Sequence, residues 1–590
     1  MIWETRVVTR RIVRLPALLT FLMVLAPHTG AQSKSPAPNL SKILPRPKLV
    51  VLLVVDQMRA DYVEKFHGQW TGGLKRLVEE GAWFRDAAYP YATTETCVGH
   101  ATISTGAFPA THGMISNEWW DRHLQQSVTC TADSKVKNLG YAGASVEGGD
   151  SAAKMLVPAF ADELKFQTGS GTRVVAFSLK ARAAITMGGR LGDAVTWFDA
   201  CAGAWTTSSA YPVAPFVEEY AKAHPVAGDY GKTWTPMLPA AAYFYDGRAT
   251  GAVPPEGMSA AFPHPLRGKP DSTGPDPVFY YQWQASPYAD TYLTRIAETA
   301  VDKLELGARA GTDFLGVSYS SVDYVGHAFG PRSWEIQDVL ARLDQHLADL
   351  FAHLDKKVGK GNYLVAFSAD HGVVPIPEDM QKAGMDAGWL NVESVKDRVE
   401  KSLEPFNYVK PAIAEVDAGD VYFTPATYDK LKNDPAALRA VLDAIQSVPG
   451  VAQVYRAEEL EDRPATKSST RTAEANNFHK ARSGDLLIVP KPYWPWDLST
   501  QGGPRQYGTT HGTPYDYDQR VPVLFMGYGI QPGEYFQSIT PTDIAPTLAA
   551  LCGITLAPRD GRVLAEALKK PSAGDAYTKP VSSRAPNARP

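Results

Sequence analysis

Cysteine is scarce in this sequence, which has four in 590 residues. Cysteines so few and so widely spaced exclude a fold built on disulfides, and no C-x-x-C pair is present to form a structural zinc site. Cys130 and Cys201 are a candidate disulfide for an oxidising compartment. Cys97 is interpreted as a small residue at a helix start, and Cys552 as a buried apolar side chain. The fold must therefore rest chiefly on a hydrophobic core.

An excess of basic residues is also missing, because 59 Lys and Arg face 63 Asp and Glu, for a net charge of -4. Such a chain has no general positive field for nucleic acid, so we expect no nucleic-acid partner and only a local anion site. Hydrophobic residues make up 44% of the chain, enough for a substantial core. The length predicts one large domain with insertions, or two domains.

Long apolar runs are rare, and the clearest one spans residues 15–26. It follows Arg6, Arg10, Arg11 and Arg14, and the small residues 29–31 come after it. This pattern predicts a secretory signal peptide over residues 1–31, cut after Ala31. An uncleaved anchor is disfavoured because the run is shorter than the ~20 residues of a spanning helix. We therefore expect a periplasmic or secreted protein with no stable membrane anchor after cleavage, by either the general or the twin-arginine export route.

Five apolar runs rich in β-branched residues predict buried strands. They lie at residues 48–56, 173–180, 314–320, 362–372 and 521–527. Continuous runs of this kind are typical of central parallel strands covered on both faces. Helical patterns stand between them, for example at residues 72–82 and 334–354. The alternation of strand and helix predicts a layered α/β fold.

Two stretches interrupt this alternation. Residues 196–285 are rich in Pro, Gly, Tyr and Trp without clear periodicity, which predicts an inserted cap or loop region. Residues 390–480 combine helical and strand patterns and predict a small inserted α+β subdomain. The main domain is expected over residues 46–566, and the Pro/Ser/Ala-rich tail over 567–590 is expected to be disordered.

Acidic and histidine residues collect where the predicted strands end. Asp56 ends the first run, and Asp370 with His371 ends the run at 362–372. Asp323 and His327 follow the run at 314–320, four residues apart and so on one helix face. Ligands of open α/β sheets bind outside the carboxyl ends of the strands, so we expect these side chains to converge.

His511, in a Gly/Thr-rich loop before the last predicted strand, completes this set. Carboxylates and imidazoles without a thiolate suit a zinc ion that keeps coordination positions for water or substrate, although manganese, iron and cobalt remain alternatives. Six candidate ligands exceed one tetrahedral site, so a two-metal centre follows. His100 and His112 are instead interpreted as hydrogen-bonded structural groups.

The ordered motifs resemble the alkaline phosphatase superfamily, and most closely its bacterial PafA-like phosphatases. The similarity rests on Asp56, on T-x-T-x-x-G-H-A at residues 94–101, on P-A-T-H-G-M-I-S-N-E-W at 109–119, on S-L-K-A-R at 178–182, and on D-x-x-x-H, A-D-H-G and T-H-G-T-P-Y-x-Y-D further along. The resemblance implies a three-layer α/β/α sandwich with a central, mostly parallel sheet. It also implies hydrolysis of phosphate monoesters with two Zn²⁺ per chain, through a phosphothreonine.

Roles within the site follow from the same resemblance. One zinc would be bound by Asp323, His327 and His511, and the other by Asp56, Asp370, His371 and the nucleophile, Thr96. Asn117, Lys180 and Arg182 would contact the phosphoryl group. A hydroxyl becomes a useful nucleophile at neutral pH once a divalent metal favours its alkoxide.

Two other functions remain open at this point. A phosphodiesterase or nucleotide pyrophosphatase could use the same scaffold, but Lys180 and Arg182 supply charge suited to the dianionic phosphoryl group of a monoester. A non-catalytic metal- or phosphate-binding protein is the second alternative, and it is disfavoured because no matched site residue is lost. We expect small phosphate monoesters as substrates and a monomeric protein.

Overall fold

The computed structural model describes residues 46–570, except 249, 418, 462–468, 498 and 500–502. The expected signal peptide and the tail from residue 571 lie outside these residues. No helix among the described residues has the length and apolar character needed to cross a membrane.

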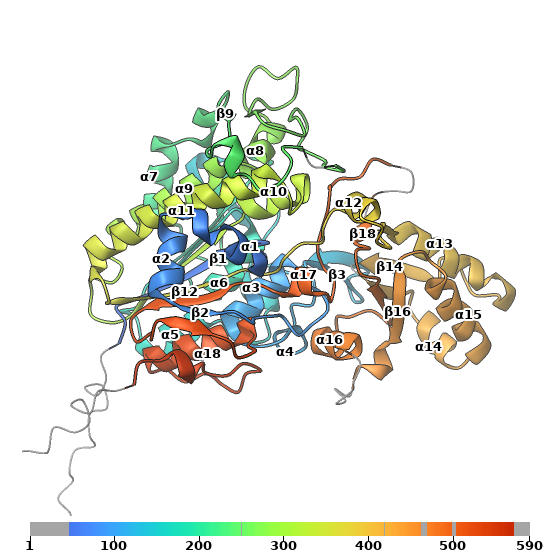
Figure 1. The fold of residues 1–590 in the computed structure, drawn as a ribbon. Coiled ribbons are helices and arrows are strands. Elements are labelled where there is room, and N and C mark those ends of the chain that lie inside the picture. Colours follow the sequence, from blue (N-terminus) through green and yellow to red (C-terminus); the bar gives the residue numbers. More distant parts are fainter. Residues whose placement is uncertain are drawn as a thin grey trace, which may run out of the picture. The chain divides into compact units, whose positions relative to one another are not determined.

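A ten-stranded sheet forms the centre of the fold (Figure 1). Its strand order is β20-β2-β19-β12-β1-β11-β6-β7-β8-β5. Its strands are β1 (Leu49–Val55), β2 (Ala82–Phe84), β5 (Asn138–Gly140), β6 (Val174–Ser178), β7 (Ala194–Asp199), β8 (Ala204–Ser208), β11 (Asp313–Tyr319), β12 (Tyr363–Ser368), β19 (Val523–Gly527) and β20 (Gly533–Tyr535). The five strands β12, β1, β11, β6 and β7 run parallel. All five runs predicted from the sequence are strands of this sheet.

The strands differ from the prediction toward the sheet edges. Strand β19 was expected to be parallel, but it pairs antiparallel with both β12 and β2. A fully apolar run reports burial on both faces and not strand direction, which explains the error. The cap expected over residues 196–285 also begins inside the sheet, because β7 and β8 form an antiparallel pair within it. Their Trp- and Thr-rich sequences carry a weaker apolar pattern than the central strands.

Helices cover both faces of the sheet, so the predicted three-layer α/β/α class is confirmed. Alternate residues of β1 point to opposite sides: Leu53 packs in a cluster with helices α9 and α11, and Leu52 in a cluster with α5 and α18. The main helices are α1 (Ala60–Phe66), α2 (Gly73–Glu80), α3 (Thr96–Thr105), α5 (Phe160–Thr168), α6 (Ala181–Gly188), α7 (Pro215–Ala223), α8 (Pro277–Gln284), α9 (Pro287–Lys303), α10 (Ser321–Phe329), α11 (Trp334–Leu354) and α18 (Ile544–Cys552).

A second, four-stranded antiparallel sheet lies outside the main one, in the order β14-β15-β17-β16. Its strands are β14 (Ile413–Asp417), β15 (Asp420–Phe423), β16 (Val451–Arg456) and β17 (Leu486–Pro490). Helices α13 (Val392–Ser402) and α15 (Pro435–Gln446) pack on it around their own apolar cluster. A separate hairpin is formed by β3 (Glu118–Asp121) and β4 (Gln126–Thr129).

The disulfide of the structure differs from the candidate drawn from the sequence. Cys130 bonds to Cys97 and not to Cys201, which is free and exposed, whereas Cys552 is free and buried as expected. The true partners are 33 residues apart in sequence with Cα atoms 6.7 Å apart. The folding of the β3–β4 hairpin against α3 makes this pair close, and local sequence cannot show such a contact.

Candidate active site

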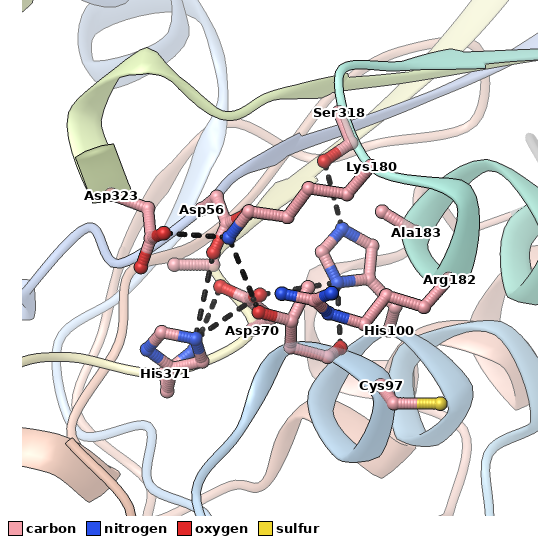
Figure 2. Close-up of polar contacts among 12 residues, drawn as sticks. Asp56, Cys97, His100, Lys180, Arg182, Ala183, Ser318, Asp323, Asp370 and His371 are labelled. Carbon is pink, nitrogen blue, oxygen red and sulfur yellow. Dashed lines mark hydrogen bonds and ion pairs between the residues drawn. The ribbon is translucent and has the colours of Figure 1, made fainter. Parts of the chain in front are cut away.

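Four neighbouring parallel strands place three acidic site residues and Lys180 at one edge of the sheet. Asp370 follows β12, Asp56 follows β1, and Lys180 follows β6, while Asp323 lies in the first turn of α10 just after β11. Because parallel strands end at the same edge, these side chains meet there, and Figure 2 shows them turned toward one another. All four are at most 6% exposed.

Lys180 lies between two of the carboxylates. Its Nζ atom is 2.6 Å from Asp56 Oδ2 and 2.6 Å from Asp323 Oδ2 (Figure 2). Although burial acts to raise the pKa of Asp323, Lys180 and His327 hold that pKa well below its ordinary value. Burial and the charge of Asp370 instead raise the pKa of Asp56. Three buried carboxylates beside one ammonium leave an excess of negative charge at this edge.

The three predicted histidines are oriented by main-chain carbonyl groups. The Nδ1 atoms of His327, His371 and His511 lie 2.9, 2.9 and 2.8 Å from the carbonyl oxygens of Thr509, Gly372 and Thr94. Each Nδ1–H therefore donates to a carbonyl, and each Nε2 is left with its lone pair. Burial lowers the pKa of both His371 and His511, which keeps the imidazoles neutral as metal ligands require.

Two of these ligand atoms, Asp56 Oδ1 and His371 Nε2, are buried and have no hydrogen-bond partner among the described residues. Asp56 Oδ2 instead faces Lys180 Nζ at 2.6 Å, and Asp370 Oδ2 faces His100 Nδ1 at 3.1 Å. Candidate ligand atoms of Asp56, Asp370 and His371 lie within 4.8 Å of one another, as do those of Asp323, His371 and His511. Buried polar atoms without partners are costly, and this set of oxygen and imidazole donors fits divalent cations.

The remaining predicted ligand, His327, also lies at this site. Its Nε2 is 3.3 Å from Asp323 Oδ1, and its ring centroid is 5.0 Å from that of His511. The structure therefore brings together all six Asp and His residues that the sequence singled out. His371 lies between the two groups, with its ring stacked 3.6 Å from the ring of His511.

Thr96 is the first residue of helix α3 and lies beside this cluster. Its Oγ1 is 3.3 Å from Lys180 Nζ, and its side chain is buried. The neighbouring hydroxyl of Thr94 donates to the carbonyl of Thr513 instead. A helix N-terminus directs free N–H groups and partial positive charge at its first residues, which suits an anion bound at Thr96.

A cleft of about 180 Å³ opens beside Thr96. Its lining includes Asn117, Lys180 and Arg182, the three residues predicted to contact a phosphoryl group. The side-chain Oδ1 of Asn117 accepts from the backbone N–H of Cys97 at 2.8 Å, so its amide NH₂ remains available as a donor. Arg182 has no ion pair or side-chain hydrogen bond among the described residues, and its Nε is buried.

Other residues of the cleft went unnoticed in the sequence. They are Glu95, Trp389, Asp417, Trp496, Asp497, Ser499, Arg505, Gln506, Tyr507 and Thr510. Burial raises the pKa of Glu95, and burial together with Glu95 raises that of Asp417. Asp417 ends strand β14 of the second sheet, so no local motif connects it with Thr96. Only Glu95, adjacent to Thr96, could have been suspected from sequence.

His100 and His112, interpreted from the sequence as structural, are hydrogen-bonded groups as predicted. His100 Nδ1 lies 2.9 Å from the carbonyl of Thr96 and 3.1 Å from Asp370 Oδ2, and its Nε2 is 2.9 Å from Ser318 Oγ (Figure 2). His112 accepts from the N–H of Met114, and burial lowers its pKa to about 3. His100 thus orients a candidate ligand without being one.

Comparison with known proteins places the chain in a family. Residues 50–514 match the family described as type I phosphodiesterase / nucleotide pyrophosphatase. The chain is 34% identical to alkaline phosphatase PafA of Elizabethkingia meningoseptica over 90% of this chain and 95% of that one. It is 31% identical to alkaline phosphatase PhoV of Synechococcus elongatus over 89% of this chain and 93% of that protein.

Solved structures agree with these relatives. The crystal structure of wild-type PafA superposes with a TM-score of 0.78 at 32% identity, covering 89% of this chain and 100% of PafA. Murine ectonucleotide pyrophosphatase/phosphodiesterase 5 shares the fold, with a TM-score of 0.50 at 15% identity over 87% of this chain and 97% of that one. The chain therefore belongs to the type I phosphodiesterase / nucleotide pyrophosphatase family. The chain is a PafA-like member of the alkaline phosphatase superfamily. This confirms the resemblance drawn from its motifs and the prediction that it is an enzyme.

Proposed function

We propose that the chain is an exported, zinc-dependent alkaline phosphatase that hydrolyses phosphate monoesters through a phosphothreonine at Thr96. The observation that carries this proposal is that the Thr96 hydroxyl and an unpaired guanidinium meet in one cleft, beside buried ligand atoms without hydrogen-bond partners. The names of the two relatives, both alkaline phosphatases, support the same reaction.

Two metal ions would be held by the chain's own carboxylates and imidazoles. We assign Asp323, His327 and His511 to one ion, and Asp56, Asp370 and His371, together with Thr96, to the other. Bound divalent ions would favour the alkoxide form of a nucleophilic hydroxyl and neutralise charge on phosphoryl oxygens. Zinc is preferred for a site of imidazole and carboxylate ligands.

The protein's own donors would bind and orient the phosphoryl group. Lys180, 3.3 Å from Thr96 Oγ1, is close enough to stabilise negative charge on that oxygen and on the phosphoryl group it attacks. Arg182 can offer its planar fork to two phosphoryl oxygens because no carboxylate occupies it. The amide NH₂ of Asn117 would donate to a third oxygen. Thr96 Oγ1 then attacks phosphorus, the ester oxygen leaves, and water releases phosphate from Thr96 in a second displacement.

These donors favour a monoester over a diester. A monoester presents three non-bridging oxygens with nearly two negative charges, whereas a diester replaces one oxygen with a bulky group and carries one charge. Lys180, Arg182 and Asn117 match the first arrangement. The diesterase alternative retains support from the family description, so it is the competitor that an experiment must exclude.

Export is supported by the predicted signal peptide and by the Cys97–Cys130 disulfide, since disulfides persist in oxidising compartments. The monomeric state stays a prediction from the sequence, to be checked by light scattering of the purified protein.

The proposed function is tested with one pair of substrates and a metal analysis. We expect kcat/KM for an aryl phosphate monoester to exceed that for the matching diester by at least about 10²-fold, the cost of losing one positioned donor. Elemental analysis should find two zinc ions per active chain. A preference for the diester would make the chain a phosphodiesterase, and phosphate binding without turnover of either substrate would make it a binding protein.

A further inference from the structure

The Cys97–Cys130 disulfide lies directly behind the proposed nucleophile. Cys97 follows Thr96 in the first turn of α3, and Cys130 is the residue after strand β4. Both cysteines are 0% exposed and pack with Met114, Ile115 and Trp119 in one apolar cluster. The bond therefore joins the helix that carries the nucleophile to the β3–β4 hairpin from within a packed core.

Asn117, which directly precedes β3, is held by both halves of this disulfide. Its Oδ1 accepts from the backbone N–H of Cys97 at 2.8 Å, and its backbone carbonyl accepts from the N–H of Cys130 at 2.9 Å. Its own backbone N–H donates to Glu95 Oε2 at 2.6 Å. The partners of Asn117 are thus the backbone N–H groups of the two bonded cysteines and the carboxylate of Glu95, the residue on the other side of Thr96.

The hairpin is held by side-chain contacts and not by a larger sheet. Among the described residues, strands β3 and β4 have four residues each and pair only with each other, while Trp119 and Val128 pack in the apolar cluster and Arg122 Nη2 lies 3.0 Å from Asp485 Oδ1. An isolated two-stranded hairpin is marginally stable in water. A covalent bond to α3 removes the freedom of the hairpin to shift relative to Thr96, which matters because small displacements of a donor cost rate.

We infer that Cys97 and Cys130 are positioning residues for catalysis: their disulfide holds the Asn117 carboxamide and the first turn of α3 at the spacing that the phosphoryl group requires. This inference rests on the proposed function, because it assigns Asn117 to the phosphoryl group. It goes beyond that function in giving the disulfide a role in the active site and not only in stability. Loss of the bond should weaken the Asn117 contact while leaving that of Arg182 intact.

The first test counts thiols in the wild-type protein. Under denaturing, non-reducing conditions, two thiols per chain should react with a thiol reagent, those of Cys201 and Cys552. After reduction, four should react. Four reactive thiols without reduction would mean that the bond does not form, and the inference would be wrong.

The second test is a double-mutant cycle. We expect Cys97→Ser/Cys130→Ser to lower kcat/KM for an aryl phosphate monoester about tenfold, a fraction of the ~10²-fold or greater loss expected for Asn117→Ala. In the Asn117→Ala background the same cysteine changes should cost less than about twofold, because the contact they support is already gone. In the Arg182→Ala background they should again cost about tenfold. Cys201→Ser, which removes an exposed free thiol, is the matched control and should leave the rate unchanged.

The pattern separates positioning from general destabilisation. A loss that is equal in the Asn117→Ala and Arg182→Ala backgrounds, or no loss in the wild-type background, would overturn the inference. Cys97→Ala/Cys130→Val, which keeps apolar volume in the cluster, repeats the cycle if the serine pair does not fold. Failure of both pairs to fold would also contradict it, because the bond would then be a requirement of folding.

Affinity for inorganic phosphate, measured by calorimetry, gives a readout independent of turnover. Removal of the disulfide should weaken phosphate binding in the wild-type background and not in the Asn117→Ala background. If the wild-type protein hydrolyses no monoester, the proposed function fails. The thiol count and the phosphate cycle would still decide whether the disulfide positions Asn117.

Discussion

The candidate metal ligands and Asn117, the proposed phosphoryl donor, are positioned by different parts of the structure. Asp56, Asp323 and Asp370 follow strands of the main sheet, whose parallel pairing aligns their main chains at one edge. Asn117 precedes a short hairpin outside that sheet and is held by three hydrogen bonds, two of them from the backbone N–H groups of the disulfide-bonded cysteines. The sheet itself positions the first group, whereas Asn117 depends on local contacts outside the sheet.

The candidate ligands and the proposed phosphoryl donors also differ in how their charges are paired. Lys180 is engaged by Asp56 and Asp323 at 2.6 Å each, whereas Arg182 meets no carboxylate among the residues described. Lys180 therefore belongs structurally to the ligand group and Arg182 to the phosphoryl group, although they are two residues apart. Experiments that affect one group and spare the other test this division.

Removal of metal should have the largest effect. Chelation should abolish monoester hydrolysis and lower the Tm, because a ligand that binds only the folded state stabilises it. Zinc should restore both activity and Tm, and titration should require two equivalents. Full recovery at one equivalent per chain would contradict the two-metal assignment.

Replacement of the nucleophile comes next. Thr96→Ala should lower kcat by about 10⁴-fold or more, as nucleophile removal does in other hydrolases. Thr94→Ala is the matched control, because the Thr94 hydroxyl donates to the Thr513 carbonyl and should change kcat only a few-fold. Comparable losses in both variants would remove the distinction between the two hydroxyls.

The substitutions Lys180→Ala and Arg182→Ala should both lower activity, but they should differ in their effect on the free energy of unfolding. Each alanine variant should lose on the order of 10²–10³ in kcat/KM through a lost phosphoryl contact. In chelated protein, Lys180→Ala should also destabilise the fold by about 3 kcal/mol or more, because it leaves Asp56 and Asp323 without their buried cation. Arg182→Ala should change stability by less than about 0.5 kcal/mol. Equal unfolding free energies for the two variants, measured in denaturant, would break the division.

A buried carboxyl group outside the site should have the smallest effect, and it should act on the pH dependence of stability and not on activity. Asp290 on α9 is 1% exposed, and burial raises its pKa to about 7. The folded state therefore binds more protons than the unfolded state from about pH 4 to pH 7, so stability falls as pH rises through this window.

The variant Asp290→Asn should remove this dependence. We expect its Tm to exceed that of the wild type by a few degrees above pH 8, with the difference shrinking toward pH 5. Thermal melts across this range measure it, and kcat should stay unchanged because Asp290 does not line the cleft. A constant Tm difference at every pH would show that Asp290 does not titrate as described.

The sequence predicted the parts of the site that depend on the regular sheet. Apolar runs marked five strands, and the rule that ligands gather at strand ends correctly predicted that Asp56 and Asp370 converge. The same runs could not predict that β19 is antiparallel or that β7 and β8 join the sheet, because burial and pairing direction are separate properties. Proximity across long separations was also invisible, as the Cys97–Cys130 bond shows. For the same reason the sequence could not reveal Asp417, which lines the same cleft as Thr96 but lies more than 300 residues away from it in the chain.

Trapping of the covalent intermediate tests the central claim most directly. The wild-type enzyme is mixed with a monoester carrying labelled phosphate, quenched in acid during turnover and digested, and the labelled peptide is sequenced by mass spectrometry. Label on Thr96, absent from Thr96→Ala and from protein treated with chelator, is the predicted result. Label on Thr94 or another residue, or steady turnover of the monoester by Thr96→Ala at the wild-type rate, would contradict the account.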